Sequence, residues 1–404
     1  MADRAAASDG AFDGAFDWGL LEPAGADGGG LGDDAVLAAM IAVEQGLISA
    51  WAQLDGGAAP RVDRVRIDRD ALRDGVRRDG VAVVDLVRQL REQVGDDADR
   101  VHRGATSQDV LDTALVLASR DALAAAGREL AVAGRALAAL ADVQRGTPVI
   151  ARTLTQPAEP TTLGAESAAW LNAVTSALEA LGGLAYPVQL GGAVGTGSAF
   201  VRISGREDAP RLLRAALART LGLADPGRAW HTDRSPVLSI AAAAGHVCAA
   251  AGRIGRGLAF AARDGVLLPE HGGGSSAMPH KKNPVDAVIL IANGLRAGGL
   301  IATLQTASLS FDARPAGEWH AEWQAWRGLL RLAVESAAVL ARATADLVVH
   351  APDASQPAPD ADGDTAPDTA LAAAGAVVDP ALERFAALEG PERADRQDRI
   401  GEGV

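Results

Sequence analysis

The stretch from Thr106 to Val143 has the sequence TSQDVLDTALVLASRDALAAAGRELAVAGRALAALADV. It opens with Thr-Ser-Gln-Asp, a hydroxyl residue followed by an acid, which is typical of a helix N-terminus. Apolar residues then recur to the end of the stretch. Leu123, Leu130 and Leu137 are seven residues apart, which is the spacing of a seam between packed helices. The stretch therefore predicts one long helix that packs in a bundle.

Four further stretches have the same apolar periodicity and are long for helices of a globular protein. Alanine is abundant and aromatic residues make up only 3% of the chain, which favours helices that pack closely through small side chains. We therefore expect an all-α protein built around a bundle of long helices. The predicted long helices cover residues 106–143, 160–183, 234–264, 284–308 and 318–349.

Composition divides the chain into four regions. Residues 1–33 are rich in Gly, Asp and Ala and are expected to form a flexible N-terminal arm. Residues 34–101 are predicted to form a small helical domain, and residues 102–349 the central bundle. In residues 350–404 a segment rich in Pro, Asp and Ala cannot bury a core. We expect a disordered linker there, then one short helix at about 379–388 as the remnant of a reduced C-terminal domain.

Charge and apolar patterning restrict the classes of partner. The formal net charge of −14 at pH 7 is unfavourable for binding nucleic acid. We expect no signal peptide and no membrane span, because we find no charge-free apolar stretch of about 18 residues. Cys248 is the only cysteine, so disulfides and cysteine-based metal sites are not expected. These features predict a cytoplasmic protein without a membrane partner.

Residues 272–284 have the sequence GGGSSAMPHKKNP and contain Lys281 and Lys282, the only lysines of the chain. Lysine provides a compact ammonium group that the planar guanidinium of arginine does not reproduce. The glycines permit a loop that can close over a substrate. Its hydroxyls, amide and cation precede a helix start and can hold a carboxylate or stabilise negative charge. We interpret the segment as a site, against the alternative of two lysines on an ordinary solvated loop.

Three other segments combine polar side chains with a predicted helix start. Residues 102–109 place His and Arg before the hydroxyls of a helix N-terminus, which suits an anion but also fits an ordinary N-cap. Residues 152–162 place polar donors before the second long helix, and alone would be a proline-rich turn. Residues 312–323 contain an arginine that leads into a tryptophan-rich helix, where the tryptophans are expected to anchor a core or an interface.

Together the four segments resemble the conserved regions of the fumarase/aspartase superfamily. The pattern Gly-Ser-Ser-x-Met-Pro-x-Lys-x-Asn at 274–283 is similar to its signature, and residues 102–109 and 152–162 match its two other regions in the expected order. The resemblance covers residues 34–349. Within the superfamily, the chain is most similar to the bacterial 3-carboxy-cis,cis-muconate cycloisomerases. The segments that carry this closer resemblance are residues 102–109, 188–196, 230–234 and 319–323.

The resemblance implies an intramolecular lyase that interconverts 3-carboxy-cis,cis-muconate and a carboxymuconolactone in protocatechuate catabolism. It implies that a carboxylate of this small tricarboxylate attacks a C=C bond, while cations stabilise enolate-like charge on a neighbouring carboxylate. Delivery of the proton to the α-carbon is a role that the resemblance gives to Ser275, with Lys281 or Arg314 as alternatives. The substrate-binding residues implied in the same way are His102, Thr106, Ser107, Thr153, Gln156, Ser276, Met278 and Asn283.

The resemblance also implies a homotetramer whose active sites take the conserved regions from different subunits. No dinucleotide cofactor is expected, because no Gly-x-Gly-x-x-Gly follows a strand pattern. No metal is expected either, because the histidines lack a metal-binding spacing such as His-x-x-x-His and have no cysteine partners. The superfamily normally ends in a third helical domain, and the predicted reduction of residues 350–404 departs from that pattern.

Leu154 bears on the choice between members of the superfamily. Lyases that release an amine usually have Arg-Thr-His-x-Gln, where this chain has Arg-Thr-Leu-Thr-Gln at 152–156. A departing amine needs an acid to protonate it, whereas a carboxylate is stable as an anion, so Leu154 favours the cycloisomerase. Two alternatives stay open. One is an adenylosuccinate-type amine-releasing lyase, and the other is a non-catalytic or degraded member, which the reduced C-terminal region would suit.

Overall fold

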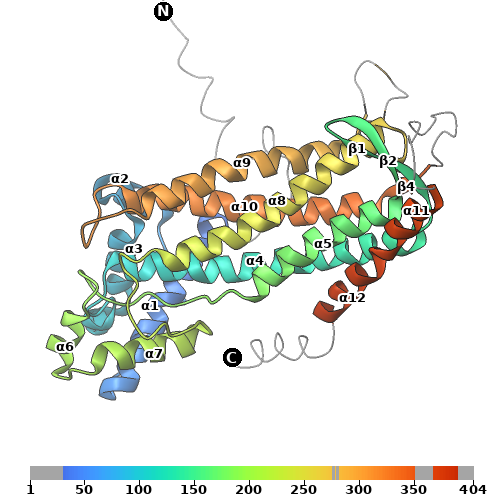
Figure 1. Cartoon of the computed structure of the whole chain (residues 1–404). Coiled ribbons are helices and arrows are strands. Elements are labelled where there is room, and N and C mark those ends of the chain that lie inside the picture. The colour runs from blue at the N-terminus through green and yellow to red at the C-terminus, as the bar shows by residue number, and fades with distance from the viewer. Residues whose placement is uncertain (1–30, 275–277, 279–281, 351–366, 390–404) are drawn as a thin grey trace, which may run out of the picture.

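Five long helices lie side by side and form the centre of the molecule (Figure 1). The computed structural model describes residues 31–274, 278, 282–350 and 367–389. Each long helix agrees with its predicted range to within a few residues, and the predicted all-α bundle is confirmed. The long helices are α4 (Ser107–Val143), α5 (Leu163–Gly182), α8 (Ser235–Arg263), α9 (Val285–Ala307) and α10 (Glu318–Ala345).

The α4 helix begins at the residue that the sequence predicted. Thr106 is its N-cap, and the backbone N–H of Thr106 donates to Oδ2 of Asp109 at 3.0 Å as part of a capping box. Leu123, Leu130 and Leu137 are buried, as their seven-residue spacing requires. With 37 residues the helix is about 55 Å long, so its two ends are far apart.

Small residues let α8 and α9 approach each other closely. A Cβ atom on Gly252 would lie 3.2 Å from the Cα of Gly294, and one on Gly255 would lie 2.6 Å from the Cβ of Leu290. The α10 helix packs against α4, α8 and α9, and α5 packs against α4 and α8. The alanine and glycine of the sequence thus serve to bring helix backbones together.

Further helices gather at the end of the bundle where α4 begins (Figure 1). The α1 helix packs on both α4 and α7. Leu47 and Trp51 of α1 share a small second core with Phe200, Leu213 and Leu217. The domain boundaries near residues 33, 101 and 349 stay predictions. The helices at this end are α1 (Asp33–Asp55), α2 (Arg69–Asp79), α3 (Ala82–Val94), α6 (Ser198–Ser204) and α7 (Ala209–Leu221).

Residues 152–162 lie mostly in a hairpin, which corrects the predicted turn. The strands β1 (Pro148–Thr153) and β2 (Gln156–Thr162) pair antiparallel. The two turn residues, Leu154 and Thr155, have φ of 47° and 71°, the left-handed conformation of a tight two-residue hairpin turn. Such turns usually contain Asn, Asp or Gly, so a leucine and a threonine gave no signal for the hairpin in the sequence.

Two further corrections concern the last part of the chain. The strand β4 (Leu347–Val349) pairs antiparallel with β3 (Leu267–Pro269). The prediction that residues 347–349 belong to the last long helix is therefore wrong. Two helices, α11 (Pro367–Ala376) and α12 (Val378–Glu389), replace the single predicted helix, and α12 packs on α4 and α5. The regions predicted as arm and linker lie largely outside the described residues, which exclude 1–30, 351–366 and 390–404.

Three of the described helices, α1, α8 and α9, are long and apolar enough to cross a membrane by length and composition alone. In α8, 61% of the most apolar window is buried within the chain, whereas in α9 the share is only 28%. The α9 helix therefore presents an apolar surface that the described residues leave largely uncovered. The absence of a membrane partner stays a prediction.

Gly164 lies where α5 meets the end of α4, and there is no room for a side chain. A Cβ atom there would lie 2.6 Å from Cα of Arg145 and 2.7 Å from the carbonyl oxygen of Ala141. Gly164→Ala should therefore lower the free energy of unfolding by about 1–3 kcal/mol. In the control Gly127→Ala, the new Cβ meets only Cδ1 of Leu181 at 3.7 Å, and stability should rise by about 0.5–1 kcal/mol. Chemical denaturation of both variants tests this, and equal effects would contradict it.

Candidate active site

Thr106, Ser107 and Arg314 meet at the N-terminus of α4. Nη2 of Arg314 donates to Oγ1 of Thr106 at 2.8 Å, although the two residues are 208 positions apart. The guanidinium carbon of Arg314 lies 5.2 Å from the ring centre of Trp319, which is buried in α10. The helix N-terminus, the hydroxyls and the guanidinium together suit a bound carboxylate.

His102 lies at the same end and is held by a carboxylate that the sequence analysis missed. Its backbone N–H donates to Oε2 of Glu44 at 3.1 Å, and its Nδ1 lies 2.7 Å from Oε1. The φ of His102 is 59°, a left-handed conformation that these two contacts stabilise. Glu44 is fully buried in α1. The contact turns Nδ1 toward Glu44, so Nε2 is the ring nitrogen that faces away from the carboxylate.

Behind Thr106, the carboxylate of Asp109 is fully buried. It accepts hydrogen bonds from the backbone N–H groups of Gly191 and Gly192 at 2.8 and 2.9 Å, and from Nε2 of Gln189 at 3.0 Å. Burial raises the pKa of Asp109 to about 6, although these donors favour the ionised form. Asp109 thus fixes residues 189–192 against the start of α4.

Arg234 joins three long helices beneath this site. Its guanidinium lies 2.7 Å from Oδ2 of Asp112 on α4 and 2.5 Å from Oε2 of Glu322 on α10. All three side chains are buried, and Nε1 of Trp319 donates to Oδ1 of Asp112 at 2.9 Å. Because Arg234 directly precedes α8, the network fixes how α4, α8 and α10 sit around the helix N-terminus. Arg234 is 122 positions from Asp112 and 88 from Glu322, so the sequence gave no sign that these residues pair.

Thr153 and Gln156 lie at the opposite end of the bundle, beside the turn of the β1–β2 hairpin (Figure 1). The side chain of Leu154 in that turn is 96% exposed. Nε of Arg152 lies 3.1 Å from Oδ2 of Asp264, which anchors the hairpin to the C-terminal end of α8. The turn therefore points away from the core of its own chain.

Asn283 also lies at this second end, where it forms a β-bridge with Gly273. We call this pair the loop neck, because the two residues flank most of the segment that resembles the superfamily signature. The backbone N–H groups of Gly273 and Asn283 each donate to the carbonyl of the other at 2.9 Å. Nδ2 of Asn283 donates to the carbonyl of Gly274 at 3.0 Å. Met278 is exposed. The predicted loop residues outside the described part of the chain are Ser275, Ser276 and Lys281.

A cavity of about 530 Å³ adjoins this neck. Asn283 lines it, together with the ion pair between Arg342 and Asp286, whose atoms approach to 2.7 Å, and with apolar side chains of α8, β3 and β4. Its volume is in the range of small-molecule sites. Of the predicted site residues, only Asn283 lines this cavity. Its other polar lining residues come from segments without a recognisable sequence pattern and are His271, Asp286, Arg342 and Asp346.

The described site residues thus form two groups at opposite ends of one chain. About 55 Å of helix separates the groups, because α4 begins at the first and ends near the second. A small carboxylate cannot contact both groups of the same chain. The first group is His102, Thr106, Ser107 and Arg314, and the second is Thr153, Gln156 and Asn283.

Comparison with known proteins assigns a family to this arrangement. Residues 70–299 match the family described as Lyase. A nitrosuccinate lyase from Streptomyces davaonensis is 39% identical over 341 aligned residues, and the match covers 78% of this chain and 72% of that protein. A 3-carboxy-cis,cis-muconate cycloisomerase from Pseudomonas aeruginosa is 41% identical over 266 aligned residues. That match covers 63% of this chain and 57% of the relative.

A solved structure gives the same result. The 3-carboxy-cis,cis-muconate lactonizing enzyme from Pseudomonas putida has a TM-score of 0.72 and 31% sequence identity, and the match covers 79% of this chain and 74% of that chain. The chain therefore belongs to the lyase family within the fumarase/aspartase superfamily, and it is an enzyme of that class. The relatives differ in the reaction for which they are named.

The charge network beneath the first group gives a stability prediction. Glu322→Ala removes one of the two carboxylates that compensate the buried guanidinium of Arg234 and should lower the free energy of unfolding by about 3–5 kcal/mol. The control Asp70→Ala removes an exposed partner of Arg73 and should change it by less than about 1 kcal/mol. Urea denaturation measures both. A loss for Glu322→Ala as small as that of the control would contradict the role of the network.

Proposed function

We propose that the chain is a cycloisomerase that closes a carboxymuconolactone from 3-carboxy-cis,cis-muconate. The observation that carries the proposal is Leu154, at the position where amine-releasing members of the superfamily usually have a histidine. A leucine cannot transfer a proton, so the group added or released should be stable as an anion. A carboxylate meets this requirement, and the relatives named as cycloisomerases support the choice.

In the proposed reaction, one carboxylate oxygen of the substrate attacks the C=C bond and forms the lactone C–O bond. The electron pair of the double bond moves toward a neighbouring carboxylate, which becomes enolate-like. Arg314 and the N-terminus of α4 stabilise this charge, and Thr106 and Ser107 donate hydrogen bonds to the same carboxylate. A proton then reaches the α-carbon from Ser275, with Lys281 or Arg314 as alternative donors. Ring closure turns one carboxylate of the substrate into an ester, and the α-carbon gains one proton, so the net reaction takes up one proton. Water restores that proton to the donor, and no other co-reactant is needed.

The second group would bind the rest of the substrate. Thr153 and Gln156 offer a hydroxyl and an amide beside the hairpin turn, and Asn283 offers an amide at the loop neck. His102, oriented by Glu44, would contact the substrate from the first group. Because the two groups of one chain are too far apart, each active site would combine the first group of one subunit with the second group of others. An isolated chain would then be inactive.

The surface of α9 supports this association. Six residues at successive spacings of three and four positions are exposed along one stripe, and Val288 and Leu295 expose 58% and 69% of their surface. Such spacing is that of a seam between helices, and a contiguous exposed apolar stripe marks an interaction surface. We propose a homotetramer in the cytoplasm, with α9 in its interface. The stripe consists of Val285, Val288, Ala292, Leu295, Gly299 and Ala302.

Cleavage of nitrosuccinate is a second candidate, favoured by the relative that matches 78% of the chain. A nitro group would leave as nitrite, the anion of a moderately strong acid, and so would need no proton donor at position 154. The first group would again stabilise charge on a substrate carboxylate. Release of an amine is disfavoured by Leu154. A non-catalytic or degraded member would consume neither substrate.

The loss of ultraviolet absorbance of 3-carboxy-cis,cis-muconate measures lactonisation directly, because ring closure removes the conjugated diene. We expect turnover by the unchanged chain and a loss of about 100-fold or more in Arg314→Ala, because the variant lacks a cation for the developing charge. The control Arg61→Ala removes an exposed arginine that pairs with Asp63 and should keep full activity. Nitrosuccinate is assayed in parallel by nitrite release.

The outcomes separate the candidates. Nitrite release from nitrosuccinate, without loss of absorbance from 3-carboxy-cis,cis-muconate, would show that the chain is a nitrosuccinate lyase and not a cycloisomerase. Cleavage of adenylosuccinate would establish the amine-releasing alternative despite Leu154. If a folded, associated protein consumes none of the three substrates, the non-catalytic alternative holds. Full activity in Arg314→Ala would remove Arg314 from the mechanism.

A further inference from the structure

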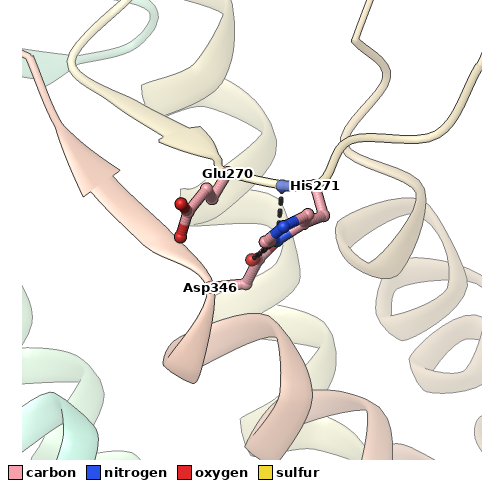
Figure 2. A group of neighbouring side chains, drawn as sticks. All are labelled: Glu270, His271 and Asp346. Atoms are coloured by element: carbon pink, nitrogen blue, oxygen red, sulfur yellow. Dashed lines mark hydrogen bonds and ion pairs between the residues drawn. The ribbon is translucent and has the colours of Figure 1, made fainter.

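Glu270, His271 and Asp346 bring three metal-binding side chains together beside the β3–β4 sheet (Figure 2). Glu270 and His271 directly follow β3, and Asp346 directly precedes β4. One ligand atom from each residue lies within 4.8 Å of the other two. The proposed reaction uses none of these side chains, and spacing along the sequence gave no sign of the group because 75 positions separate His271 from Asp346.

Backbone contacts hold these residues together. The N–H of Glu270 donates to the carbonyl oxygen of Asp346 at 2.8 Å, which extends the pairing of the two strands. The N–H of His271 donates to Oδ2 of Asp346 at 2.9 Å. These contacts fix the two strand ends and the carboxylate of Asp346, so the three side chains start from neighbouring backbone positions.

A metal ion could replace the proton between His271 and Asp346. Nδ1 of His271 lies 2.6 Å from Oδ1 of Asp346 (Figure 2). Zn²⁺ binds nitrogen and oxygen ligands at about 2.0–2.2 Å in tetrahedral geometry, so two of its ligand atoms are about 3.4 Å apart. The pair would therefore have to open by about 0.8 Å. The side chain of His271 is 81% exposed, which leaves it room to move.

We propose that Glu270, His271 and Asp346 bind a divalent transition-metal ion such as Zn²⁺, with water completing its coordination. One imidazole nitrogen and two carboxylates are a donor set that suits Zn²⁺. Mg²⁺ prefers an octahedral shell of oxygen atoms and retains its water, so it should bind poorly here.

The local charge is compatible with a cation. The two carboxylates contribute two negative charges, and Lys282 contributes one positive charge close by, since its Nζ donates to the carbonyl of Glu270 at 2.9 Å. A bound ion would link the end of β3 to the start of β4, two residues before the loop neck formed by Gly273. This inference does not depend on which reaction the enzyme catalyses.

Calorimetric titration of the metal-free full chain with ZnCl₂ tests the site. We expect binding in the unchanged chain and a loss of affinity of at least about 10-fold in both His271→Ala and Asp346→Asn. The control His350→Ala removes another exposed histidine, at the far end of β4, and should bind zinc like the unchanged chain. Titration with MgCl₂ should show much weaker binding.

The pH dependence gives an independent check. The imidazole nitrogen can bind a metal ion only when it carries no proton. A proton therefore competes with the metal at low pH, and zinc should bind more weakly at about pH 6 than at about pH 8. Affinity unchanged across this range would oppose binding through the imidazole.

Equal zinc affinity in the unchanged chain and in His271→Ala would overturn the site and assign the binding to adventitious groups elsewhere. Thermal unfolding of each metal-free variant shows whether it is folded. If His271→Ala does not fold, Glu270→Gln decides, because it keeps the contact between His271 and Asp346 and removes one negative ligand. Zinc affinity in folded Glu270→Gln equal to that of the unchanged chain would also overturn the three-residue site.

Discussion

The length of the central helices is the constraint on which the functional arrangement depends. The chain reverses direction between α4 and α5 and again between α8, α9 and α10, so the described parts of these connections lie at the two ends of the bundle (Figure 1). A helix backbone satisfies its own hydrogen bonds and places apolar side chains against its neighbours, which leaves the middle of the bundle without free polar backbone groups. The proposed substrate-binding residues therefore lie at both ends, and one chain alone cannot unite them.

The first end is built by interactions that serve the fold and the site together. Asp109 caps α4 and also fixes Gly191 and Gly192 beside it. Arg234 holds α4 and α10 at the start of α8 through Asp112 and Glu322. These buried charges tolerate little change, because removal of one partner leaves another without compensation. The rigid base they form presents the N-terminus of α4, where charge stabilisation would act without reorganisation.

Much of this architecture could be predicted from local patterns, and the remainder depends on contacts between distant segments. The capping box and the leucine spacing of α4 are local, so its start and its buried face were predicted. The buried carboxylate of Glu44 has its partner in His102, 58 residues away. A glutamate in an apolar helix does not indicate from the sequence which residue it will pair with. The turn at Leu154 and Thr155 adopts a conformation that these residues rarely favour. The resemblance proposed the residues of both groups, but chain order does not show that they lie at opposite ends.

Subunit complementation tests the central claim most directly. Arg314→Ala disables the first group and Asn283→Ala the second, and each variant is assayed alone and after co-expression in mixed oligomers, with whichever substrate the unchanged chain consumes. If sites combine residues from different subunits, each variant alone is inactive, and the mixture recovers activity because some sites receive an intact group from each chain. Mixed oligomers that form but stay inactive, or an isolated monomer with full activity, would contradict a shared site.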